Sequence, residues 1–174
     1  MIYFLIFIFI IELTFCFEHT KNKQSKIILA TLIILTLSFL AGSRSPNIGT
    51  DNLVYAEFYQ KCVSSSLKQI FIQNSSEIES FEVGFVFLTW MISRIGSDFY
   101  TFAFFTSLIS FSFIFFGINY YKARFSMSIS IMAFLFMFYC PLLNYVRQGI
   151  ALSIAFFSWR YAEERKVFKY MFFV

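Results

Sequence analysis

The chain contains 174 residues, of which 59% are hydrophobic and only 14% are charged. Soluble domains are roughly half apolar and a quarter charged, so this composition excludes an ordinary soluble domain and predicts a membrane protein. The net charge of +4 is modest, and we expect it to reflect how loops are oriented across a membrane rather than binding to nucleic acid.

The first elements are two apolar helices. Residues 1–17 form an apolar run that is interrupted only by Glu12 and Thr14. The run lacks the basic start and the small-residue cleavage site of a signal peptide, so we expect a transmembrane helix. After a lysine-rich loop, residues 27–42 predict a second span, which ends before the helix-breaking residues around Pro46.

Residues 43–82 are the longest polar section, and we expect them to form an extracytoplasmic loop. Apolar and aromatic side chains recur at helical spacing over residues 54–63, which is typical of an amphipathic helix lying on the membrane surface. Gly49 permits a tight turn before this helix, and Thr50 or Asp51 can then cap it.

The second half of the chain predicts further membrane segments. Residues 83–93 are apolar but only about half a bilayer long, so we favour a half-membrane or re-entrant segment over a crossing. Residues 99–118 and 127–143 predict two full spans with a short basic loop between them. A last span begins near Asn144 and continues through Tyr161.

These elements predict an all-α fold. It is a polytopic transmembrane helical bundle of about five spanning helices, with a half-membrane segment and an amphipathic outer-loop helix, in one transmembrane domain over residues 1–174. Orientation follows from the lysine and arginine count in the loops. If residues 83–93 do not cross, nine of the 14 basic residues face the cytoplasm, namely Lys21, Lys23, Lys26, Lys122, Arg124, Arg160, Arg165, Lys166 and Lys169. If they did cross, this bias would be lost.

The sequence gives little support for metal or disulfide chemistry. The three cysteines, Cys16, Cys62 and Cys140, are odd in number and far apart, so they predict neither a disulfide framework nor a metal site. The single histidine, His19, lies in the lysine-rich loop, so a zinc site or a His-based triad cannot be built within the chain. We expect no metal and no cofactor.

Arg147 needs an explanation because it opens an otherwise apolar segment. In the expected topology it starts a helix that runs inward from the outer membrane face, where an ionisable side chain is costly unless it has a partner or faces a polar cavity. Helical spacing places Asn144, Arg147 and Gln148 on one face, and small residues from Ala151 to Ala162 would let a neighbouring helix approach. A guanidinium at a helix N-terminus suits the phosphate of a lipid-linked substrate. An arginine that snorkels to lipid headgroups is the alternative.

Two carboxylates of the outer region are candidates for chemistry. Asp51 either caps its helix or projects into a site for sugar hydroxyls or proton transfer, with Tyr55 four residues on and therefore on the same face. Glu82 starts the half-length segment, where it either takes part in catalysis or marks the water boundary. A structural ion pair with an arginine on the same side is a further alternative.

Three motifs follow one another along the chain: Gly-x-Asp followed by Tyr, then Glu-x-Gly-Phe, then Arg-Gln with Ala soon after. They stand at Gly49, Asp51 and Tyr55; at Glu82, Gly84 and Phe85; and at Arg147, Gln148 and Ala151. Taken in this order, they resemble the EpsG family of bacterial polysaccharide-biosynthesis membrane proteins, which is similar to Wzy-type polymerases. The resemblance covers about residues 44–170. The family is longer, and this chain stops a few residues into another apolar run, so we expect it to be the N-terminal part of a longer domain.

The resemblance implies a multi-pass protein of the cytoplasmic (inner) membrane that assembles extracellular or capsular polysaccharide. It would polymerise undecaprenyl-pyrophosphate-linked oligosaccharide units at the outer face, with membrane lipids and other polysaccharide-assembly proteins as further partners. Arg147 would neutralise the donor pyrophosphate, and Asp51 or Glu82 would orient or deprotonate the acceptor hydroxyl. The candidate substrate-binding residues are Arg44, Tyr55, Asn144 and Gln148.

Two non-enzymatic functions compete with polymerisation. One is a transporter or flippase-like component, and the other is a structural member of a polysaccharide export complex. A transporter would place polar groups at mid-membrane, whereas Glu12 is the only ionisable residue that we place well inside a span. The clustering of polar residues at the outer side therefore favours the polymerase.

Overall fold

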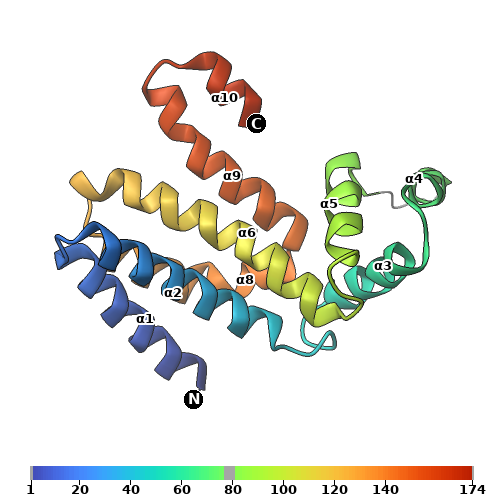
Figure 1. Cartoon of the computed structure of the whole chain (residues 1–174), viewed down its shortest axis with the longest axis horizontal. Coiled ribbons are helices and arrows are strands. Elements are labelled where there is room, and N and C mark those ends of the chain that lie inside the picture. Colours follow the sequence, from blue (N-terminus) through green and yellow to red (C-terminus); the bar gives the residue numbers. More distant parts are fainter. Residues whose placement is uncertain (1, 77–80, 174) are drawn as a thin grey trace. The chain divides into compact units, whose positions relative to one another are not determined.

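The computed structural model describes residues 2–76 and 81–173, in which helices are the only extended regular elements (Figure 1). The prediction of an all-α fold is confirmed. In chain order the helices are α1 (Ile2–His19), α2 (Lys23–Gly42), α3 (Asn52–Ser64), α4 (Leu67–Ser76), α5 (Val83–Ser93), α6 (Phe99–Tyr120), the short 3-10 helix η1 (Tyr121–Ala123), α7 (Met127–Met137), α8 (Tyr139–Asn144), α9 (Val146–Glu163) and α10 (Val167–Phe173).

The chain forms two compact units, which are described separately. Unit 1 comprises Met1–Ser38 and Ser107–Val174, and unit 2 comprises Phe39–Thr106. Two helices are long and apolar enough to cross a membrane, namely Lys23–Gly42 and Phe99–Ala123, while α5 and α7 are shorter apolar helices. Each of these two helices contributes residues to both units.

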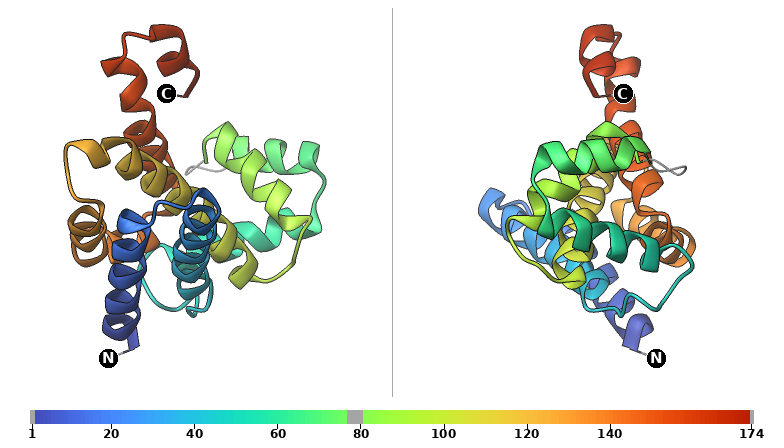
Figure 2. Two further views of the ribbon diagram at one scale, coloured as in Figure 1. Left: turned by 60° about the vertical axis from the view of Figure 1, so that its left-hand side comes forward. Right: turned by 90° about the vertical axis from the view of Figure 1, so that its right-hand side faces the viewer.

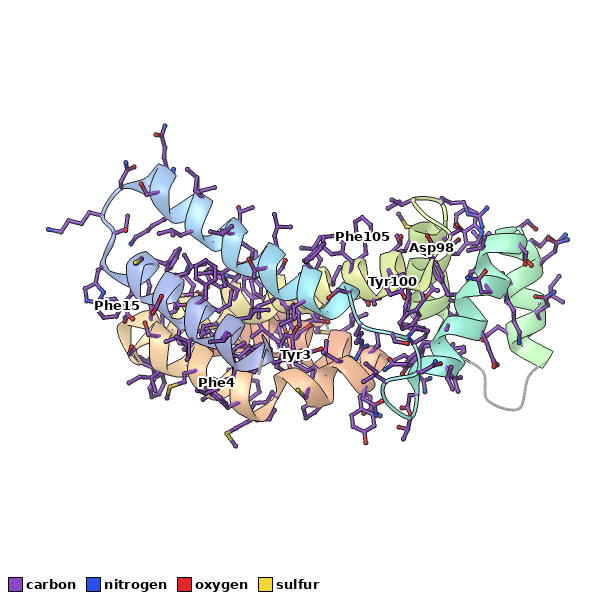
Figure 3. The ribbon with its side chains drawn as sticks, turned by 90° about the horizontal axis from the view of Figure 1, so that it is seen from below. Tyr3, Phe4, Phe15, Asp98, Tyr100 and Phe105 are labelled. Carbon is purple, nitrogen blue, oxygen red and sulfur yellow. The ribbon has the colours of Figure 1, made fainter. Side chains whose placement is uncertain are left out.

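In unit 1, α1 packs along α7 (Figure 2). The packed face of α1 is formed by buried residues spaced three or four apart, as a helix requires: Phe7, Ile10, Thr14 and Phe17. The Phe7 ring meets the Tyr139 ring of α8 edge-on at 5.2 Å. Tyr3, Phe4 and Phe15, which Figure 3 labels on α1, are instead 41–55% exposed. Aromatic side chains left uncovered on this scale are typical of a surface that faces lipid or another protein.

The carboxylate of Glu18 joins the end of α1 to the start of α7. It accepts hydrogen bonds from the backbone N–H groups of Met127 and Ser128, both at 3.3 Å, and from the Ser128 hydroxyl at 2.8 Å. The first N–H groups of a helix have no partner within the helix and favour a negative charge. Glu18 therefore supplies from another helix the cap that Ser126 does not supply through its own side chain.

Residues 127–143, which were predicted to form one span, form two helices. α7 ends at Met137 and α8 begins at Tyr139, with Phe138 between them at φ −117° and ψ −20°. Pro141 explains the break, since its ring would clash with the carbonyl of Met137 four residues earlier and it has no N–H to donate. The helix is therefore interrupted between α7 and α8.

The helix expected from Asn144 through Tyr161 is confirmed in outline as α9, which begins two residues later. Tyr145, at φ −96° and ψ 61°, separates α8 from α9. The expected shared face of Asn144, Arg147 and Gln148 is wrong, because Asn144 belongs to α8 and is not in helical register with the other two. The small residues that α9 buries are Gly149, Ser153 and Ser158. Of the predicted stripe, Ser158 is therefore buried, Ala155 and Ala162 are half-buried, and Ala151 is exposed.

Gly117 permits close packing of α6 and α9 in unit 1. A Cβ atom built on Gly117 would lie only 2.6 Å from the Phe156 ring of α9. A larger residue at position 117 would have to displace that ring, because protein interiors leave no such space. The glycine therefore sets how closely the C-terminal half of α6 approaches α9.

Unit 2 is built around an aromatic core. The amphipathic helix expected over residues 54–63 is confirmed as α3, but its apolar face packs against α5 within the unit. The side chains that α3 buries are Asn52, Tyr55, Phe58, Tyr59 and Cys62. The half-length apolar segment was predicted residue for residue, since α5 spans Val83–Ser93.

Asn74, near the end of α4, is hydrogen-bonded to the backbone of Phe81 just before α5. Its side-chain amide donates to the carbonyl of Phe81, and its side-chain oxygen accepts from the Phe81 N–H, both at 2.8 Å. The Asn74 side chain is buried. Residues 74–76 match a glycosylation sequence, but the Asn74 side chain is buried and hydrogen-bonded within unit 2.

Candidate functional site

The first motif forms the turn that leads into α3. Gly49 has φ 103°, a conformation that other residues rarely adopt, so the predicted tight turn is confirmed. Asp51 stands at the N-cap position of α3, but its side chain makes no capping hydrogen bond to the helix. The Thr50 hydroxyl donates to the Asp51 carboxylate at 2.9 Å. The Asp51 side chain is half-buried.

Arg44 lies inside unit 2, where it supports this turn. Its side chain is buried, and its Nη2 donates to the Oδ1 atom of Asn52 at 3.0 Å. The amide of Asn52 in turn donates to the Ile48 carbonyl. A buried guanidinium is costly unless it is hydrogen-bonded, so Arg44 and Asn52 together fix the shape of the turn that carries Asp51. The sequence analysis missed Asn52.

The first and second motifs meet through their aromatic residues. Tyr55 is buried, and its ring lies 5.8 Å from that of Phe85 and 6.1 Å from that of Phe81. Phe81 directly precedes Glu82, whose side chain is exposed at the start of α5. The structure therefore brings the Gly-x-Asp-Tyr and Glu-x-Gly-Phe motifs into one aromatic cluster, which separate stretches of sequence could not show.

Gly84 of the second motif has no packing role among the described residues. A Cβ atom built on it would meet no described atom within 4 Å, so nothing there requires a glycine. Glycine in a helix costs up to about 1 kcal/mol relative to alanine. A glycine that packing does not need leaves room for something to approach the backbone beside Glu82.

The C-terminal end of α3 is hydrogen-bonded by Arg94, which the sequence did not indicate as a site residue. The Arg94 guanidinium donates to the carbonyls of Cys62 and Val63, which places a positive charge at the C-terminus of α3. Burial raises the pKa of the Cys62 thiol to about 12, so this cysteine stays protonated and is a poor nucleophile. Burial likewise raises the pKa of Tyr59 to about 12, which keeps its hydroxyl protonated as a donor to the Gly96 carbonyl.

The third motif belongs to unit 1. Arg147 is half-buried in the first turn of α9, next to the exposed Gln148. The first helical hydrogen bond of α9 runs from the N–H of Gly149 to the Tyr145 carbonyl at 2.7 Å. Asn144 is half-buried at the end of α8.

A cavity of about 760 Å³ lies among α6, α7, α8 and α9, and we call it the α9 groove. Its walls are mostly apolar and include Ile118, Phe134, Leu142, Leu152 and Phe156. Gln148 lines it at one end, whereas Arg147 is not among its described lining residues. Of the candidate residues of unit 1, Gln148 alone is among the described residues that line this apolar cavity.

Within residues 2–76 and 81–173, no group of three or more His, Cys, Asp or Glu side chains could hold a metal ion.

Comparison with known families identifies the chain. The model of the EpsG family matches residues 27–174, which include all three motifs. The chain belongs to the EpsG family. The resemblance predicted from the motifs is confirmed, and this EpsG-family chain is a membrane protein related to polysaccharide biosynthesis. No curated protein and no solved structure matches the chain.

Proposed function

We propose that this EpsG-family chain polymerises lipid-pyrophosphate-linked repeat units at the outer face of the cytoplasmic membrane. The observation that carries the proposal is the family match over residues 27–174, which takes in all three polar motifs. The apolar helices α2 and α6 support insertion in a membrane. Extracellular or capsular polysaccharide is the expected product.

In the proposed topology, the chain crosses the membrane several times. The α1–α2 loop with the first turn of α2, the connection between α6 and α7, and the last turn of α9 with the region after it carry nine of the 14 basic residues. Basic loops favour the cytoplasmic side. The first turn of α9 would then lie at the outer side, and the segment formed by α3, α4 and α5 would also enter from that side.

In the proposed reaction, an acceptor hydroxyl attacks the anomeric carbon of the sugar that is attached to the donor pyrophosphate. The new glycosidic bond forms as the carbon–oxygen bond to the pyrophosphate breaks. The pyrophosphate leaves on its lipid, and the hydroxyl proton passes to a base. Negative charge develops on the leaving group, so a guanidinium placed there stabilises the transition state more than the ground state.

Arg147 takes this charge-neutralising role in the proposal. Its guanidinium matches the oxygens of a phosphate, and the first turn of an 18-residue helix adds N–H groups and a positive partial charge. Gln148 and Asn144 are proposed to bind the substrate beside it. Each of these three residues is within or next to the α8–α9 turn.

Asp51 or Glu82 is proposed to orient or deprotonate the acceptor hydroxyl. The exposed Glu82 beside Gly84, which has open space above its Cα, leaves room for a sugar to approach. Arg44 and Tyr55 remain proposed substrate-binding residues, and their burial means that they would act by shaping the surface around Asp51.

The direct test uses proteoliposomes that contain the purified chain. The substrate is radiolabelled lipid-linked repeat unit, isolated from the host strain that lacks this gene. Polymerisation predicts products longer than one repeat unit. Movement of label across the bilayer without any lengthening would contradict the proposal and indicate a transporter, and the absence of both would indicate a structural component.

The proposed topology is tested by cysteine labelling in intact cells. Cys16 and Cys140 are exposed and are first replaced by serine, whereas Cys62 is buried and can stay. In that background, Ser97→Cys should react with a membrane-impermeant maleimide from outside, and Ala123→Cys should react only after permeabilisation. The reverse pattern at either position would contradict the topology.

A further inference from the structure

One side of α5 in unit 2 is apolar and exposed. Val83, Phe87 and Met91 are 71%, 46% and 49% exposed, and they recur every four residues, so they lie along one side of the helix. We call this row the α5 ridge. Isolated exposed apolar side chains are ordinary, but a row of them on one helix is typical of an interaction surface.

The other side of α5 packs against α3 and α4 (Figure 1). The side chains that it buries are Phe85, Val86, Thr89, Ile92 and Ser93. Seen along the helix axis, these positions lie opposite the α5 ridge, because successive residues of a helix are about 100° apart. The ridge is therefore the side of α5 that faces away from α3 and α4.

The outward sides of α3 and α4 are mostly polar. In its first turn α3 exposes Leu53 and Val54, and past that turn it exposes Glu57, Gln60, Lys61 and Ser64. The described side chains that α4 exposes are Lys68, Gln69, Ile72, Gln73 and Ser75. A polar layer thus backs an apolar ridge. This segregation matches the step from water to hydrocarbon at a membrane surface.

The two ends of α5 indicate how the helix is oriented to that surface. Glu82 precedes the helix and Arg94 follows it, and both side chains are exposed, whereas Val83–Ser93 contains no charged residue. A helix of 11 residues that entered the bilayer end-on would place one of these charges about 16 Å deep, near the middle of the hydrocarbon. A charge at that depth is costly. A helix that lies along the surface keeps both charges at the level of the headgroups.

Trp90 flanks the α5 ridge and joins it to the polar layer. Its side chain is half-buried, and its Nε1 donates to the Ser65 carbonyl at 3.3 Å. The Arg94 guanidinium lies 5.1 Å from the centre of its ring. Tryptophan and arginine are favoured at the membrane–water boundary, because each combines an apolar body with a polar end. Their place beside the ridge indicates that this boundary runs along α5.

The size of the ridge favours lipid over a second protein. A helix of 11 residues is about 16 Å long and about 11 Å wide, so one side of it offers on the order of 200 Å². A stable protein interface needs about 800 Å² from each partner. Contact with acyl chains has no such minimum, because its strength scales with the apolar area that is buried.

We propose that unit 2 rests on the membrane through the α5 ridge, with α5 parallel to the surface and the upper acyl chains of the lipids as its partner. In the proposed topology this is the outer leaflet. The sequence favoured a half-membrane path for α5 and placed the surface helix at residues 54–63. α3 turns its apolar residues into the unit, so α5 takes that place instead. The proposal does not require the chain to make polysaccharide.

The test measures the depth of spin labels on the full chain in vesicles of phosphatidylethanolamine and phosphatidylglycerol. Labels are attached singly after Val83→Cys, Phe87→Cys or Met91→Cys, in the background in which Cys16 and Cys140 are replaced by serine. All three positions are exposed, so the labels leave the core of unit 2 intact. Depth is read from collisions with oxygen, which concentrates in the bilayer, and with a water-soluble nickel chelate. We expect one shared depth of about 5–10 Å.

Gln60→Cys and Ser64→Cys are the matched controls, because they carry the label on the polar side of α3. They should collide mainly with the nickel chelate. A half-membrane or crossing α5 would give depths that change by about 6 Å from each ridge label to the next, which would overturn the proposal. Ridge labels shielded from both reagents would overturn it by assigning the ridge to a protein partner. Ridge labels as accessible to the chelate as the controls would overturn it by leaving the ridge in water.

The outcomes separate this inference from the proposed function. Equal shallow depths in a chain that makes no polymer would contradict polymerisation and leave the membrane contact of α5 in place. Graded depths in a chain that lengthens the glycan would do the opposite.

Discussion

The rings of Tyr55 and Phe85 lie 5.8 Å apart in the core of unit 2. Each ring belongs to a different motif of the EpsG family, and 29 residues of sequence separate them. The contact joins the start of α3, next to Asp51, to the start of α5, next to Glu82. The aromatic residues of both motifs therefore have a packing role, and the two carboxylates lie close to them in the sequence.

Tyr55→Ala should destabilise unit 2 by about 3 kcal/mol, because it removes a buried aromatic ring and leaves a cavity. Tyr55→Phe keeps the ring and should change the free energy of unfolding by less than about 1 kcal/mol. Unfolding in detergent can be followed by the fluorescence of Trp90, which lies in α5, in a Trp159→Phe background. Equal destabilisation by both variants would show that the hydroxyl, not the ring, matters.

Gly84→Ala should raise the stability of unit 2 by up to about 0.5 kcal/mol, because alanine is the better helix former and its Cβ meets no described atom. If a sugar approaches the backbone beside Glu82, the same substitution should shorten the polymer. A variant that folds at least as well and polymerises normally would remove Gly84 from the proposed site. Thermal unfolding and gel analysis of the glycan together decide this.

Asn74→Ala should cost about 2 kcal/mol, because it leaves the N–H and carbonyl of Phe81 without their buried partner. Asn74→Asp should cost at least as much at neutral pH, because it buries a carboxylate and brings one of its oxygens against the Phe81 carbonyl oxygen. Ser75→Ala, at an exposed neighbouring position, serves as the control. Urea unfolding that reports the same stability for Asn74→Ala and Ser75→Ala would show that this link is dispensable.

Glu18 should make unit 1 sensitive to acid. The hydroxyl of Ser128, followed by other donors around α7, lowers the pKa of Glu18 below its ordinary value of 4.5. The folded-state pKa is depressed, so the stabilisation is present above about pH 4.5 and is lost as the pH falls through the lower folded-state value. The melting temperature of unit 1, read from Trp159 in a Trp90→Phe background, should therefore fall on acidification.

The Glu18→Gln variant should be less stable than wild type at neutral pH and should show a flatter acid response. Glu12→Gln, which changes an exposed carboxylate of the same helix, should leave the wild-type response in place. Identical acid profiles for wild type and Glu18→Gln would exclude the proposed link between α1 and α7.

Local sequence predicted the elements whose ends are marked by polar residues. α5 was predicted to the residue because Glu82 and Arg94 flank a mostly apolar run without charges. α3 was predicted because its buried residues recur at helical spacing. Pro141 indicates the break at Phe138, but the continuous hydrophobicity of residues 127–143 favoured a single span.

The contacts that shape the candidate site could not be predicted from local patterns. Arg94 reaches carbonyls about thirty residues earlier, and Glu18 caps a helix more than a hundred residues later. Helical phasing placed Asn144 beside Arg147, but it assumed one helix where Tyr145 separates two. Such long-range bonds depend on the fold as a whole, so only the structure shows them.

The central proposal is that Arg147 neutralises the charge of the donor pyrophosphate. The length of the polymer made in cells tests this role most directly. Arg147→Ala should shorten or abolish the polymer, by tenfold or more in chain growth if one charged contact to the transition state is lost, while Arg147→Lys should retain part of the activity. Lys122→Ala, which removes an exposed cation outside the motifs, should have no effect. Full-length polymer from Arg147→Ala at normal membrane abundance would contradict the claim.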